Sequence, residues 1–265
     1  MKHKETSSDR HTFAIHAPRA LSLITARNVG LPCAIRDADV WHRIAHVLHA
    51  RVGDEFIFFD TEKVIYLELT SLATKNTVEG ILQTLDQPRS LMPTINLFQG
   101  LLKREAWSDV TYYAAQMGVT RIIPLITTKT QREWGSDREV ERMRNVMIAA
   151  CEQAHQFALP EIAQPVSFAA EIFAPLVTVS RQVVVYCETG GTPFFTSLTS
   201  LVATQPEVIN VVIGPEGGFT TEECRVLDLC GAQRMALTPS ILRAQEAVAV
   251  CIGALRSALG QNIEI

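Results

Sequence analysis

The chain has 265 residues, 47% of them hydrophobic and 20% charged, which is enough for one large hydrophobic core or two unequal ones. Its formal net charge of −4 excludes a protein that coats nucleic acid through positive charge alone. The polar residues 1–10 lack the apolar core of a signal peptide, and no apolar run is long enough to span a bilayer. These features predict a cytoplasmic protein with no membrane segment.

Six cysteines are scattered along the chain, with no C-x-x-C pair and no histidine at ligand spacing. In a chain of this size without a secretory signal, such cysteines are most simply reduced, mostly buried thiols. We therefore expect neither disulfides nor a metal site.

Two prolines among polar residues in segment 86–93 predict a domain boundary, with domains at 1–90 and 91–265. The first domain is expected to be small and β-rich, because its short apolar runs are rich in β-branched and aromatic residues. Its predicted strands are 55–59, 64–69 and 77–82, preceded by a short helix at about 39–49.

Strand-like and helix-like segments alternate after the boundary, the pattern of an α/β domain with a largely parallel sheet. The predicted strands are 94–98, 121–126, 183–187 and 208–213, and apolar residues at helical spacing predict helices in 107–117 and 140–154. Capping boxes are expected at Ser136 with Glu139 and at Thr220 with Glu223. Ser240 is expected to cap a last helix that reaches Leu259.

Two apolar runs end abruptly in loops that precede predicted helices. One run ends in Ile213-Gly214-Pro215-Glu216-Gly217-Gly218-Phe219, and the other continues as Leu237-Thr238-Pro239-Ser240-Ile241-Leu242-Arg243. Glycines let a ligand approach the backbone closely, and parallel sheets bind ligands beyond the carboxyl ends of their strands. The two loops are therefore expected to form one crevice, although the first also fits a tight strand-to-helix turn with no ligand.

The phosphate-loop and dinucleotide-binding fingerprints are both absent, which removes the best signatures of ATP hydrolysis and of conventional NAD binding. An enzyme that holds a phosphorylated metabolite at the helix N-terminus after Gly218 remains an alternative.

The two loops, with weaker support from Ile148-Ala149-Ala150-Cys151-Glu152-Gln153 and Gly53-Asp54-Glu55-Phe56-Ile57-Phe58-Phe59-Asp60, resemble the RsmE family of the SPOUT superfamily. That family uses S-adenosylmethionine to methylate N3 of a uridine in small-subunit (16S) ribosomal RNA. The resemblance implies a PUA-like, RNA-binding N-terminal domain, a C-terminal α/β domain with a trefoil knot, and a homodimer. It also implies ribosomal RNA or the small ribosomal subunit as the partner.

The resemblance also implies roles for individual residues. Arg243 is expected to bind the RNA backbone or to stabilise negative charge that develops on the uracil, or else to be a surface arginine that caps a helix turn. The general base stays open. The residues expected to bind the cofactor are Glu188, Ile213, Gly214, Pro215, Glu216, Gly217, Gly218, Leu237, Ile241 and Leu242.

The chain departs from the family pattern at several polar positions. Ala244-Gln245-Glu246-Ala247 stands where the family usually has Thr-Glu-Thr-Ala, and Glu152-Gln153-Ala154-His155-Gln156 lacks an arginine of the family motif. One interpretation is an active uridine methyltransferase in which Arg104, Arg132, Arg142 and Arg144 contact RNA by another route. The other is a protein of the same fold with a changed RNA substrate, or a noncatalytic RNA- or protein-binding role.

Overall fold

The computed structural model describes residues 12–260. Residue contacts divide the chain into two compact units, Met1–Arg89 and Ser90–Ile265. The division lies within the proline-containing segment 86–93. Within residues 12–260 no helix is long and apolar enough to cross a membrane, and no group of three or more His, Cys, Asp or Glu side chains is placed to hold a metal ion. All six cysteines are free thiols.

The N-terminal unit is built on a five-stranded sheet in the order β1-β3-β4-β5-β2. The three predicted strands are present, and β5 continues to Asp86 because it pairs along the length of β4. The two edge strands, β1 and β2, were not predicted, since five residues with one neighbour each give a weak pattern. The strands are β1 Thr12–His16, β2 Pro32–Arg36, β3 Glu55–Phe59, β4 Val64–Ser71 and β5 Thr77–Asp86.

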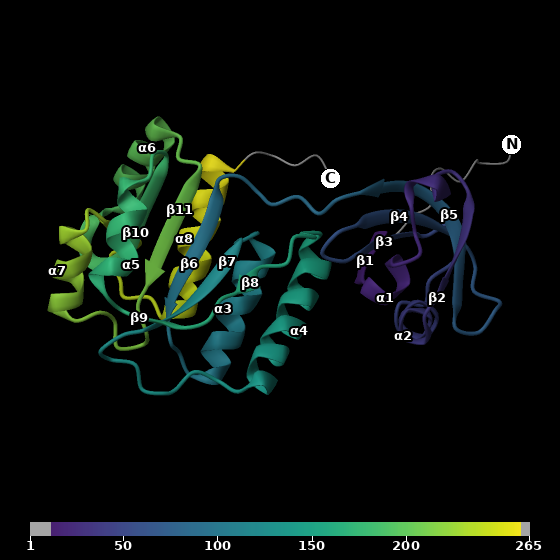
Figure 1. The fold of residues 1–265 in the computed structure, drawn as a ribbon, viewed down its shortest axis with the longest axis horizontal. Coiled ribbons are helices and arrows are strands. Elements are labelled where there is room, and N and C mark those ends of the chain that lie inside the picture. The colour runs from purple at the N-terminus through teal and green to yellow at the C-terminus, as the bar shows by residue number, and fades with distance from the viewer. Residues whose placement is uncertain (1–11, 261–265) are drawn as a thin grey trace, which may run out of the picture. The chain divides into compact units, whose positions relative to one another are not determined.

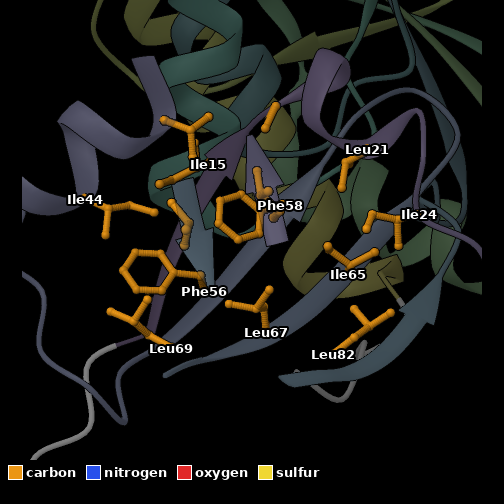
Figure 2. Close-up of a cluster of buried hydrophobic side chains, with 14 residues drawn as sticks. Ile15, Leu21, Ile24, Ile44, Phe56, Phe58, Ile65, Leu67, Leu69 and Leu82 are labelled. Carbon is orange, nitrogen blue, oxygen red and sulfur yellow. The ribbon is translucent and has the colours of Figure 1, made fainter. Parts of the chain in front are cut away.

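Short helical segments cover this sheet. The helix expected at 39–49 is present as α2 (Ala38–His42) continued by a π-helical turn, Arg43–Val47. A short helix α1 (Pro18–Leu21) and a 3-10 turn, Ala26–Asn28, precede β2. Figure 2 shows the core that these elements share, in which Phe56 and Phe58 of β3 and Leu67 of β4 pack with Ile44. Burial of this apolar surface gives the unit a core of its own.

The C-terminal unit contains a seven-stranded sheet in the order β12-β10-β11-β6-β7-β8, with β9 beside β7. Every pairing in this sheet is parallel, as the sequence predicts for its main part. The carboxyl ends of the strands therefore lie along one edge. The strands are β6 Thr94–Gly100, β7 Arg121–Ile126, β8 Glu161–Ile162, β9 Val166–Ser167, β10 Gln182–Pro193, β11 Val208–Ile213 and β12 Gln233–Ala236.

Helices cover both faces of this sheet (Figure 1). On one face α3 packs between α4 and α8, and α6 packs on α8. On the other face α5 and α7 pack together, and Phe173 of α5 and Leu227 of α7 share a core with Val212 of β11. The helices are α3 Arg104–Gln116, α4 Asp137–Ala154, α5 Ala170–Thr178, α6 Phe194–Thr204, α7 Thr221–Leu229 and α8 Ala244–Leu259.

The helix starts differ from the predictions in two places. The capping box of Thr220 and Glu223 is present with both of its hydrogen bonds. Ser136 stands at the N-cap of α4, but its side chain makes no capping bond, because the Glu139 N–H donates to the Ser136 carbonyl at 2.8 Å instead. The Glu139 carboxylate pairs with Arg132. Ser240 is not a cap, since α8 begins at Ala244, after a loop.

Candidate functional site

A cavity of about 340 Å³ lies at the carboxyl ends of β11 and β12, beside residues 187–189 within β10. All ten residues predicted to bind the cofactor line it: Glu188, residues 213–218, Leu237, Ile241 and Leu242. The two loops therefore meet in one crevice, as expected for loops that follow the carboxyl ends of parallel strands. Cys187 and Thr189 also line the cavity and were not predicted, since nothing in their local sequence distinguishes them.

Close backbone packing explains the glycines around the first loop. A Cβ atom on Gly100, at the end of β6, would lie 2.3 Å from the Pro215 nitrogen, and one on Gly214 would lie 3.2 Å from Gly218. Gly218 has a φ of +65° and donates a 2.8 Å hydrogen bond to the Pro215 carbonyl. The loop therefore needs glycine for both space and conformation.

Side chains from β6 and from the loop after β7 hold the glycine-rich loop from outside. The Gln99 amide donates to the Gly214 carbonyl at 3.1 Å. The Lys129 ammonium donates to the carbonyls of Gly217 at 2.7 Å and Phe219 at 2.9 Å. These carbonyl groups are thereby fixed in direction, which preorganises the loop for a ligand.

Glu216 extends this network toward α3. Its carboxylate accepts a 2.8 Å hydrogen bond from the backbone N–H of Lys103, the N-cap residue of α3. Glu216 is exposed and lines the cavity. Its carboxylate therefore orients the loop.

The helix that follows the loop begins with a buried carboxylate. Glu223 accepts hydrogen bonds from the backbone N–H groups of Thr128 at 2.8 Å and Thr220 at 2.7 Å. Burial raises the pKa of Glu223, but the hydrogen bonds from Thr128 and Thr220 outweigh it, so the pKa lies below the ordinary value of 4.5. The folded protein thus stabilises the charged form of Glu223.

Glu188 brings a second carboxylate to the cavity. One of its oxygens accepts bonds from the Thr189 N–H at 2.9 Å and the Thr189 hydroxyl at 3.0 Å. The other oxygen lies 4.0 Å from the Cys224 sulfur. Burial, with the nearby charge of Glu188, raises the pKa of the Cys224 thiol, which keeps that thiol protonated at neutral pH. Glu188 can accept hydrogen bonds from ligand hydroxyl or amino groups.

The second loop presents an apolar wall. Leu237 and Leu242 are half-buried, whereas Ile241 is 86% exposed at the cavity. Thr238 shapes the loop through a 2.6 Å hydrogen bond to the Ser240 carbonyl. Together with buried Ile213, these side chains form a slot suited to a flat, weakly polar ring.

Arg243 is exposed and lies outside the cavity lining, although its neighbours Leu242 and Ala244 line it. It occupies the N-cap position of α8, and its side chain makes no capping bond. A cation there opposes the helix dipole. Helix capping therefore does not explain the guanidinium of Arg243, which remains available beside the cavity.

The sequence of the chain matches a known protein family. A model of the RNA methyltransferase domain matches residues 89–256. The chain is 28% identical over 240 residues to ribosomal RNA small subunit methyltransferase E of Buchnera aphidicola subsp. Schizaphis graminum, covering 83% of this chain and 88% of the relative. It is 26% identical over 219 residues to the protein of the same name from Synechocystis sp., covering 82% and 71%.

A solved structure has the same fold. The chain matches the ribosomal RNA small subunit methyltransferase E from Neisseria gonorrhoeae, bound to S-adenosyl methionine, with a TM-score of 0.74 and 22% identity over 94% of this chain and 99% of that one. At this identity the likeness establishes the α/β fold. Because the family match spans well over half of the sequence, the chain belongs to the RNA methyltransferase family, as a member of the RsmE family that its loops resemble.

Proposed function

We propose that this protein transfers the methyl group of S-adenosylmethionine to N3 of a uridine in small-subunit (16S) ribosomal RNA. The observation that carries the proposal is the meeting of two loops, far apart in sequence, in one cavity at the carboxyl edge of a parallel sheet. The names of the relatives and the cofactor of the matched structure support the same reaction.

The cavity residues fit S-adenosylmethionine. The volume of about 340 Å³ falls within the roughly 300–1,000 Å³ of small-molecule sites. Ile213, Leu237 and Leu242 offer apolar surface for the adenine, and the glycine-rich loop offers backbone groups without intervening side chains. Glu188 is placed to accept hydrogen bonds from hydroxyl or amino groups. When bound, the cofactor supplies a methyl group already activated by a positively charged sulfur.

The uracil N3 is a weakly acidic imide nitrogen, so methylation requires removal of its proton and stabilisation of the negative charge that develops. Arg243 supports the second requirement, because its guanidinium is exposed, beside the cavity and not used as a helix cap. The glycine-rich loop is held by Lys129 and Glu216, which fixes the cofactor side of the alignment.

The proposal also includes the domains, the oligomeric state, the location and the RNA partner that the family resemblance implies. The N-terminal unit is proposed to be a PUA-like, RNA-binding domain, and the C-terminal unit a SPOUT domain with a trefoil knot. The protein is proposed to work as a homodimer in the cytoplasm, on ribosomal RNA or the small ribosomal subunit. The five-stranded mixed sheet and the parallel sheet of the two units support this assignment.

Two measurements test the function. Isothermal titration calorimetry with S-adenosylmethionine and S-adenosylhomocysteine is expected to show binding of both, and no heat from either would overturn the proposal. Mass spectrometry of 16S ribosomal RNA from a deletion strain is expected to show loss of N3-methyluridine. Full retention of the modification with cofactor still bound would instead favour a changed RNA substrate or a noncatalytic role, an alternative motivated by the altered residues after Arg243.

A further inference from the structure

We propose that Arg104, Arg138 and Arg142 form a subsite for a backbone phosphate of the RNA substrate, next to the cofactor cavity. The inference rests on the proposed function, since it concerns how RNA is held for methylation. It begins from a second cavity of about 340 Å³ between the first turns of α3 and α4. Arg104 comes from α3, and Arg138 and Arg142 from α4.

The shape of this cavity is set by buried side chains. Trp107 and Met143 are both buried and line it, with the indole N–H of Trp107 directed at the Met143 sulfur. The hydroxyl groups of Ser108 and Ser136 also line the cavity, and that of Ser136 makes no capping bond. An apolar floor with cationic and hydroxyl groups at its rim suits an anionic group carried by a larger ligand.

The charge of the cavity is positive. None of the three guanidinium groups has a hydrogen bond or ion pair within residues 12–260. Glu139 is the one carboxylate that lines the cavity, and it is already paired with Arg132 at 2.7 Å. Arginine binds phosphate oxygens bidentately through its planar fork. The arrangement therefore leaves three such groups for an anion.

The position of these arginines in α3 and α4 points the same way. Arg104 begins α3, and Arg138 is the second residue of α4. Cations at helix N-termini oppose the helix dipole, whereas a phosphate there is favoured by it. The acidic residues of the same turns, Glu105 and Asp137, are exposed and do not line the cavity. A bound phosphate would thus offset the unfavourable interaction of these arginines with the dipoles of α3 and α4.

A hydrogen bond to the residue before Arg104 links this cavity to the first one. Lys103 immediately precedes Arg104, and its N–H donates to Glu216, which lines the cofactor cavity. A uridine whose base reaches the first cavity carries phosphates on both sides, and these must follow the adjacent protein surface. Phosphate contacts position the RNA without reading its sequence, the task that remains once a base is in the cavity.

RNA binding by the full-length protein tests the subsite. Fluorescence anisotropy with a short fluorescein-labelled oligouridylate would compare wild type with the double variant Arg138→Glu/Arg142→Glu. The double variant is expected to bind at least about 10-fold more weakly. The slope of log affinity against log salt concentration should be shallower by about 0.7 for each phosphate that the protein no longer neutralises. The double variant Arg181→Glu/Arg225→Glu is the control with the same change in net charge, because both arginines are exposed, belong to the C-terminal unit and line neither cavity. It is expected to bind RNA nearly as wild type does.

Several outcomes would overturn the subsite. These are equal RNA affinity of the double variant and wild type, an equal loss in Arg181→Glu/Arg225→Glu, and equal binding of an oligouridylate with an uncharged methylphosphonate backbone. Wild-type protein that fails to bind the oligouridylate would do the same. If wild type bound inorganic phosphate and the double variant did not, while both bound RNA equally, the cavity would be a site for free phosphate and not for RNA. Calorimetry with S-adenosylmethionine separates these failures from failure of the proposed function, because the double variant should bind the cofactor as wild type does.

Discussion

The carboxylate of Glu216 accepts a 2.8 Å hydrogen bond from the backbone N–H of Lys103, which ties the glycine-rich loop after β11 to the start of α3. Lys129, in the loop after β7, holds the same glycine-rich loop. The loop is therefore fixed by segments that follow two other strands of the sheet. Such support reduces the conformational freedom that ligand binding would otherwise have to remove.

Gly100 should be intolerant of a side chain although it lies outside the glycine-rich loop. In Gly100→Ala the new Cβ would meet the backbone nitrogen of Pro215 at 2.3 Å, and overpacking of this kind typically costs about 1–3 kcal/mol. We expect the affinity for S-adenosylmethionine, measured by calorimetry, to fall by about 10-fold, since 1.4 kcal/mol corresponds to a factor of ten.

Gly253→Ala is the control for Gly100→Ala. Gly253 lies within α8, and a Cβ there would meet only the Met117 sulfur, at an ordinary 3.5 Å. The control should bind S-adenosylmethionine like wild type, with a slightly more stable helix. If Gly100→Ala and Gly253→Ala had the same cofactor affinity, the packing of Gly100 against the loop would not matter for binding.

Lys129 should contribute to cofactor affinity without touching the cofactor cavity. Lys129→Ala removes the ammonium that bonds the carbonyls of Gly217 and Phe219, and such bonds are worth about 1 kcal/mol each. Binding of S-adenosylmethionine should weaken several-fold in calorimetry. Lys129→Met keeps the aliphatic stem that packs on Gly217 and should weaken binding as much. Recovery of wild-type affinity in Lys129→Met would show that packing, not hydrogen bonding, is what matters.

The main elements of the cavity were predictable because their signals are local. An apolar run that ends in glycines marks a buried strand followed by a loop, and a parallel sheet brings such loops to one edge. The supports of the loop were not predictable. Lys129 and Gly217 are 88 positions apart, and Gln99 and Gly214 are 115 apart, and a single sequence carries no signal for such contacts.

Other differences between the predicted and the observed elements have their own physical causes. Helix α5 contains Pro175 in its interior, which argues against a helix in any local reading. Ser136 and Glu139 fit the capping-box pattern, but a bidentate contact with Arg132 engages the Glu139 carboxylate. The Glu139 N–H donates to the Ser136 carbonyl rather than to its hydroxyl, so both halves of the capping box are replaced by other contacts. The domain roles, the homodimer and the knot came from family resemblance and stay predictions.

Arg243 should act on methyl transfer more than on cofactor binding. Arg243 is exposed and outside the cavity lining, so Arg243→Ala should leave the calorimetric affinity for S-adenosylmethionine within about twofold. Loss of a donor that stabilises developing charge typically lowers kcat by about 10²–10³, measured as methyl transfer to 16S ribosomal RNA. A role confined to RNA affinity would raise KM and leave kcat unchanged. A loss of cofactor affinity as large as the loss of methyl transfer would contradict both roles.

Glu223 should make the stability of the C-terminal unit sensitive to acid. Its pKa in the folded protein lies below the ordinary 4.5, because hydrogen bonds from Thr128 and Thr220 outweigh the effect of burial. A carboxyl group with a lowered folded pKa stabilises the fold above its unfolded pKa, and this contribution disappears as the pH falls through the folded pKa. At neutral pH, Glu223→Gln should lower the free energy of unfolding by about 1–3 kcal/mol.

Urea denaturation between neutral pH and pH values below 4.5 would measure this effect. In a Trp41→Phe background, tryptophan fluorescence reports only on Trp107 and Trp134, which both belong to the C-terminal unit. The difference in unfolding free energy between this background and Glu223→Gln should shrink as the pH falls below 4.5, because protonation removes the same charge from Glu223. Glu222→Gln is the control, since Glu222 is exposed and pairs with Arg225 on the surface, where ion pairs contribute little. A difference between the background and Glu223→Gln that stayed constant across the acid range would show that the charge of Glu223 is not what stabilises the start of α7.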